Sequence, residues 1–131
     1  MTDPISKPRR RILTVNCNTG LQTSLASILS RAGYEVGHAA NGNVAVQMHR
    51  CNPFDAVIIE IVVLERDGLE TLIQLTAQAS PPKMIAMSGE SRIPAELYLT
   101  MARHLGAQGA LAKPSQLEEL LGAVRRVLGE T

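Results

Sequence analysis

Three reactive side chains follow three separate apolar segments of the sequence. Glu60 ends one apolar run, Ser88 follows another, and Lys113 comes directly after a third. A carboxylate, a hydroxyl and an ammonium group can exchange hydrogen bonds and charge if the fold brings them together. Because ligand sites of open α/β sheets lie at strand ends, Glu60 is a candidate acceptor of a chemical group. Glu60 either accepts a chemical group or only forms an ion pair with the ammonium group of Lys113.

Short apolar runs alternate with longer amphipathic segments from residue 11 onward, which predicts alternating strands and helices. The expected strands are 12–15, 34–38, 56–59, 84–87 and 110–112. The expected helices lie around 21–29, 44–48, 69–75, 97–105 and 117–128. Gly33 and Gly106 are expected to end the first and fourth helices.

Five consecutive strand–helix units predict an α/β fold in which helices cover both faces of one parallel sheet. The third and fourth strands are apolar without alternation, which is typical of the buried centre of such a sheet. Since parallel strands share one carboxyl edge, the positions after the strands are expected to converge. Residues 1–10 are expected to form a flexible polar tail, and residues 11–131 a single domain.

Composition excludes several classes of function. With 45% hydrophobic and 19% charged residues, the chain of 131 residues is typical of a globular protein. Aromatic residues make up 2% and the net charge is +1, which argues against nucleic-acid and membrane partners. Cys17 and Cys51 lack the spacing of a metal site, and no secretion signal or membrane-spanning segment is apparent. We expect a cytoplasmic protein with reduced thiols.

The order and spacing of these segments are similar to those of a known family. Residues 10–128 resemble the receiver (CheY-like) domain of bacterial two-component response regulators. The most specific segments are Asp-Gly-Leu-Glu-Thr-Leu at 67–72, Met-Ser-Gly at 87–89, Leu-Gly-Ala at 105–107 and Lys-Pro at 113–114. The resemblance implies a flavodoxin-like (βα)5 doubly wound parallel sheet with strand order 2-1-3-4-5.

The resemblance also assigns roles to individual positions. The family's phosphorylated aspartate falls on Glu60, and its two acidic magnesium ligands fall on Asn16 and Cys17. Its hydroxyl residue falls on Ser88 and its lysine on Lys113. The chain therefore keeps the serine and the lysine but departs from the family at the acceptor and at both metal positions.

Two further departures concern the switch mechanism that the resemblance implies. The family's switch aromatic falls on Ala110, and its proline after the acceptor falls on Leu64. Ala110 has no side-chain rotamer to change. The signal path to the fourth and fifth helices is therefore expected to be absent or altered, with one fixed conformation of that face.

The chemistry of these positions predicts a degenerate site without a metal cofactor. Magnesium prefers hard oxygen ligands, whereas Asn16 offers a neutral carbonyl and Cys17 a soft sulfur. Glu60 is longer than aspartate by one methylene, and Lys113 can neutralise it without a metal. We expect that Mg-dependent aspartyl phosphorylation is lost and that the chain is not an enzyme.

The leading hypothesis is a stand-alone receiver-like signalling module that acts through protein–protein contact. Its expected partner is a sensor kinase, a phosphotransfer protein, another regulator or a second copy, bound through the face formed by 97–105, 110–112 and 117–128. The alternatives are a conditionally phosphorylated regulator and a small-ligand-binding flavodoxin-like domain. Glu60 either mimics the phosphorylated state by reaching Ser88 and Lys113 or merely fills the position. A redox role for Cys17 also stays open.

Overall fold

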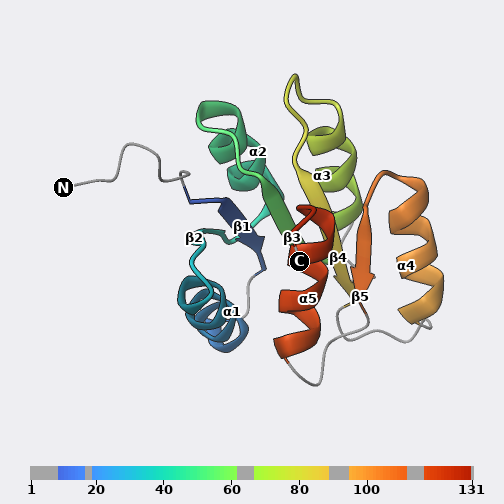
Figure 1. Cartoon of the computed structure of the whole chain (residues 1–131). Helices are drawn as coiled ribbons and strands as arrows, with labels where there is room; N and C mark the ends of the chain where they lie inside the picture. Colours follow the sequence, from blue (N-terminus) through green and yellow to red (C-terminus); the bar gives the residue numbers. More distant parts are fainter. Residues whose placement is uncertain (1–8, 17–18, 62–66, 89–94, 112–116, 131) are drawn as a thin grey trace.

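Strands and helices alternate along the whole described chain (Figure 1). The computed structural model describes residues 9–16, 19–61, 67–88, 95–111 and 117–130. The strands are β1 (Arg11–Val15), β2 (Glu35–Ala39), β3 (Ala56–Ile61), β4 (Lys83–Ser88) and β5 (Gly109–Leu111). The helices are α1 (Thr19–Arg31), α2 (Gly42–Cys51), α3 (Asp67–Thr76), α4 (Ala95–His104) and α5 (Leu117–Val127).

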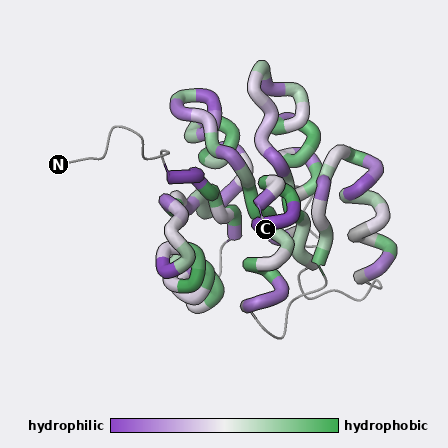
Figure 2. The backbone as a smooth tube through the Cα atoms, in the orientation of Figure 1, coloured by the Kyte–Doolittle hydropathy of each residue, from purple (hydrophilic) through white to green (hydrophobic). Residues whose placement is uncertain are grey.

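All five strands pair in parallel in one sheet of order β2-β1-β3-β4-β5, which confirms the predicted fold class and strand order. Helices α2, α3 and α4 pack on one face of the sheet, and α1 and α5 pack on the other. Hydropathy in Figure 2 alternates along the helices, as expected for helices with one buried face. Among the described residues, none of the helices combines the length and apolar character needed to span a bilayer.

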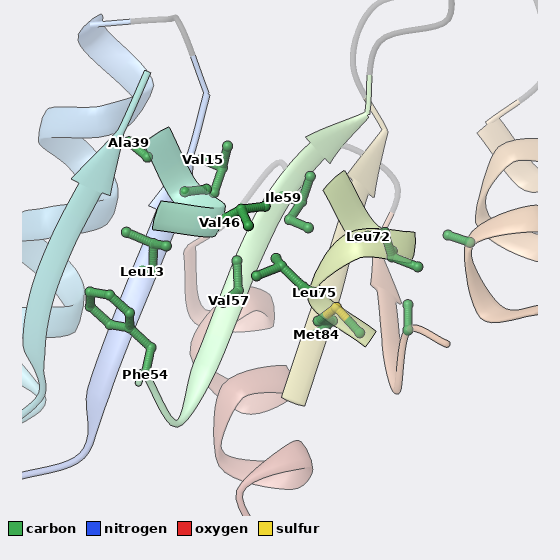
Figure 3. Packing of buried hydrophobic residues seen from close by; sticks show 14 residues of the cluster. Leu13, Val15, Ala39, Val46, Phe54, Val57, Ile59, Leu72, Leu75 and Met84 are labelled. Atoms are coloured by element: carbon green, nitrogen blue, oxygen red, sulfur yellow. The ribbon is translucent and has the colours of Figure 1, made fainter. Parts of the chain in front are cut away.

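The central strand β3 contributes side chains to both hydrophobic cores. Val57 and Ile59 pack toward α2 and α3, as Figure 3 shows, whereas Ala56 and Ile58 pack toward α1 and α5. All four side chains are buried, with at most 1% of their surface exposed. This alternation follows from the two-residue period of a strand, and the unbroken apolar run confirms the predicted buried centre.

A buried histidine joins three segments at the amino edge of the sheet. His49 of α2 is 1% exposed. Its Nδ1 accepts a hydrogen bond from the Phe54 backbone N–H at 3.0 Å, so its Nε2 carries the proton and donates to the Ser80 carbonyl at 2.6 Å. At the same corner, the guanidinium of Arg11 lies over the Phe54 ring, 4.2 Å from its centre, in a cation–π contact. No sequence motif indicates this structural role of His49, because its partners are backbone groups.

The predicted glycine ends of α1 and α4 are confirmed. Gly33 and Gly106 have φ angles of +97° and +118°, which place them in the left-handed region that terminates helices. At Gly106 an added Cβ would lie 2.9 Å from Oγ1 of Thr76, so a side chain meets both backbone strain and a steric contact.

Replacing Gly106 with alanine is therefore expected to lower the free energy of unfolding by more than about 1 kcal/mol, as measured by urea denaturation. Gly122 in α5 is the matched control, since an added Cβ there would have no neighbour within 4 Å. Gly122→Ala is expected to raise stability by about 0.5–1 kcal/mol because alanine is the better helix former. Equal effects at the two sites would contradict this explanation.

Candidate functional site

The carboxyl edge of the sheet brings Asn16 next to Glu60. Val15 pairs with Ile59, so the next residues, Asn16 and Glu60, lie beside each other across β1 and β3. Strand alternation places both on the face of Ile58, which is the face that α1 and α5 cover. On its other side Glu60 pairs with Met87 of β4, which is 1% exposed. The Glu60 position thus has an amide residue on one side and a buried thioether on the other.

The predicted strand ends need correction by one or two residues. Glu60 does not end β3, because the ladder continues to Ile61, which pairs with Ser88. Ser88 likewise does not follow β4 but is its last residue. Backbone hydrogen bonds of a parallel ladder do not depend on side-chain polarity, so the strands extend past the apolar run. Glu60 remains at the carboxyl edge, with a half-buried side chain.

Asn16 is held at this edge by its backbone as well as by burial. Its N–H donates to the Ala39 carbonyl of β2 at 3.2 Å, and the residue is only 7% exposed. An amide tolerates such burial more readily than a carboxylate, because a buried ionised group requires a compensating charge or metal. The position in which the family carries an acidic residue is thus a buried neutral one in this chain.

Only part of the predicted site lies within the described residues. Cys17, Lys113 and the side chain of Ser88 lie outside them, so the proposed contacts of Glu60 with Ser88 and Lys113 stay predictions. Ala110 lies in β5, where it pairs with Ala86 and is half-buried. The smallest chiral side chain therefore occupies the strand position assigned to the family's switch aromatic.

The described residues do not provide a carboxylate-rich metal site. Within them, no group of three or more histidine, cysteine, aspartate and glutamate residues is placed to hold a metal ion. As far as the edge is described, it presents one carboxylate, Glu60, and one amide, Asn16, which fits poorly with the hard, mainly carboxylate ligands that magnesium favours. The expected loss of magnesium binding remains a prediction, since Cys17 is not described.

A second polar pair lies one step further into the sheet on the same face. Oγ1 of Thr14 is 3.2 Å from Nδ1 of His38 in the neighbouring strand β2. Burial lowers the pKa of His38 below its ordinary value, and a hydrogen bond with Thr14 opposes that effect in part. The lowered pKa favours the neutral form of the imidazole. The pair was not predicted from the sequence, because it depends on the register between β1 and β2.

Comparison with known proteins places this architecture in a family. Residues 12–125 match the response regulator receiver domain. The transcriptional regulatory protein PdtaR of Mycobacterium tuberculosis is 28% identical over 124 residues, which cover 94% of this chain and 58% of that protein. The response regulator MprA of Mycobacterium leprae is 31% identical over 121 residues, which cover 92% of this chain and 52% of that protein. The chain thus spans about half the length of these relatives.

Solved structures show the same fold. A putative response regulator from Chloroflexus aurantiacus superposes with a TM-score of 0.83 at 25% identity, covering 94% of this chain and all 100% of that one. A response regulator from Burkholderia pseudomallei with a phosphorylated aspartic acid has a TM-score of 0.75 at 23% identity, covering 92% of this chain and 69% of that one. The chain belongs to the response regulator receiver domain family, which confirms the resemblance seen in the sequence.

Proposed function

We propose that this chain is a degenerate receiver domain that signals through protein contact without Mg-dependent phosphorylation of an aspartate. Receiver domains are signalling modules that interact with kinases and other proteins in two-component systems. In this proposal, the acceptor and metal positions no longer support phosphoryl transfer. The chain catalyses no reaction of its own and works in the cytoplasm.

The buried amide of Asn16 is the observation that carries this proposal. Asn16 is 7% exposed and lies beside Glu60, so the described residues at this position contribute one carboxylate and one neutral amide. Phosphoryl transfer relies on a metal and on precise positioning to stabilise charge on the transferring group. A neutral amide at a metal-ligand position and a longer carboxylate at the acceptor position weaken both contributions.

An exposed apolar pair on α4 supports a role in protein contact. Leu97 and Met101 lie one turn apart on the same side of this helix and are 53% and 42% exposed. Met101 does not fill the core as methionines commonly do, whereas Ala102 next to it is fully buried. Large apolar side chains left in water favour a partner that covers them, and α4 belongs to the α4–β5–α5 face that we propose as the contact surface.

Magnesium titration tests the loss of the metal site. We expect that Mg²⁺ at about 10 mM produces no saturable shift of the Asn16 and Glu60 amide signals in NMR spectra, because Asn16 and Cys17 replace the two carboxylates that would hold the ion. The control is Asn16→Asp combined with Cys17→Asp, in which saturable shifts are expected. Saturable binding of Mg²⁺ to the unmodified chain in the same range would contradict the proposal.

A further inference from the structure

A small polar hollow lies between the first turn of α2 and the helix α3, which are neighbours on one face of the sheet (Figure 1). It has a volume of about 260 Å³ and is lined by Asn41, Gly42, Asn43, Glu70, Thr71 and Gln74. One water takes up about 30 Å³ in the liquid, and pockets for drug-sized ligands begin at about 300 Å³. The hollow therefore has the size for a small polar molecule. It lies on the face opposite to that of Glu60.

The α2 end of the hollow offers two backbone donors. The Asn41 side chain accepts from the Val44 N–H at 3.0 Å, and the Asn41 carbonyl accepts from the Ala45 N–H at 3.1 Å. Within the part of the chain that the structure describes, the N–H groups of Gly42 and Asn43 have no protein acceptor. The first N–H groups of a helix require partners and attract negative charge, so this end suits a carboxylate.

A buried hydroxyl independently marks the α3 side of the hollow. Thr71 is only 3% exposed, and its side chain has no hydrogen-bond partner among the described residues. No fully enclosed polar side-chain atom of the described residues lacks a partner, so the Thr71 hydroxyl is open to the hollow it lines. A hydroxyl that no protein group bonds and that faces the hollow is free to donate to, or accept from, a bound ligand.

Charge along the hollow selects the kind of ligand. Glu70 brings a carboxylate to the wall, and none of the lining residues that the structure describes is basic, which disfavours phosphate and other multivalent anions. A ligand that places an ammonium group near Glu70 and a carboxylate near the start of α2 complements both ends. The amides of Asn43 and Gln74 can donate hydrogen bonds to the ligand and accept them from it.

We propose that this hollow binds a free α-amino acid as its zwitterion. The carboxylate accepts from the N–H groups of Gly42 and Asn43, and the ammonium group donates to Glu70. Thr71 supplies a further hydrogen bond from the wall. The inference is independent of the proposed loss of phosphorylation, because these residues lie on the face of the sheet opposite to that of Glu60.

The test uses L-alanine, L-serine and L-glutamine as probes, with NMR amide shifts as the readout. At least one probe is expected to produce saturable shifts at Gly42, Asn43 and Thr71. Its N-acetyl derivative, which lacks the ammonium group, and its C-terminal amide, which lacks the carboxylate, are each expected to bind about tenfold or more weakly, equivalent to about 1.4 kcal/mol. No saturable shift with any probe up to about 100 mM, roughly 1.4 kcal/mol of binding free energy, would overturn the proposal.

Substitutions of lining residues distinguish binding in this hollow from binding in the neighbouring groove. Glu70→Gln and the isosteric Thr71→Val are each expected to weaken the bound probe about tenfold or more while the circular dichroism spectrum stays unchanged. Gln78→Ala is the matched control, because Gln78 lines the neighbouring groove between α2 and α3 but not this hollow. Equal binding by all four proteins, or equal binding of the N-acetyl derivative, would refute the assignment.

Discussion

Replacing Asn16, Cys17 and Glu60 together with aspartate is expected to produce a protein that takes up a phosphoryl group from acetyl phosphate in the presence of magnesium. The three changes restore the acidic set that the family uses and return the acceptor to its shorter length. The backbone that positions Asn16 and Glu60 is already in place, since β1 and β3 hold these residues side by side. The expected change is from no modification to modification of a large fraction of the protein.

Intact-mass spectrometry measures this gain, with Glu60→Asp alone and Asn16→Asp with Cys17→Asp as partial controls. Neither partial variant is expected to gain a phosphoryl group to a comparable extent, because metal and acceptor act together. If the triple variant folds by circular dichroism yet stays unmodified, the loss of function does not lie in these three residues.

Replacement of His49 by alanine is expected to have the largest effect on stability, lowering the free energy of unfolding by about 2–5 kcal/mol. The substitution leaves the Phe54 N–H without its acceptor and the Ser80 carbonyl without its donor. It also removes a ring that stacks on Phe54 with centroids 6.5 Å apart. The end of α2, the residue Phe54 before β3 and the segment at Ser80 before β4 lose their common contact.

Urea denaturation at constant pH measures this effect, and His104→Ala is the matched control. His104 is an exposed residue at the end of α4, where a substitution is expected to change stability by less than about 0.5 kcal/mol. A similar small change for both histidines would show that the buried contacts of His49 do not stabilise the fold.

The sequence was sufficient for the fold because each local signal agreed with the global one. The apolar run of β3 and the left-handed glycines after α1 and α4 all appear where the pattern placed them. The strand ends were less accurate, since the pairing of Ile61 with Ser88 depends on the backbone of a neighbouring strand. Such pairing is a tertiary property that a single segment does not encode.

The candidate site was predictable only as far as motifs define it. Family spacing located Asn16 directly after β1 and Ala110 within β5, whereas Glu60 lies one residue before the end of β3 rather than at it. His49 was missed because its partners are backbone atoms of Phe54 and Ser80, which leave no side-chain motif in the sequence. The hollow beside Thr71 was missed for a similar reason, since it depends on how α2 and α3 pack.

Exposed apolar positions on α4 show a second limit of pattern reading. Leu97 and Met101 have the spacing of a buried stripe, yet the helix turns other residues toward the sheet. Periodicity identifies an apolar face but not what covers it. A helix face that binds a partner protein and a helix face that packs in the core therefore show the same spacing of apolar residues in a single sequence.

Incubation of the unmodified chain with acetyl phosphate and magnesium, followed by intact-mass spectrometry, tests the central claim most directly. We predict that the mass of the unmodified chain stays unchanged under conditions in which the variant with aspartate at positions 16, 17 and 60 gains a phosphoryl group. Uptake of a phosphoryl group by the unmodified chain, lost again in Glu60→Gln, would contradict the claim that the site at Glu60 no longer supports phosphoryl transfer.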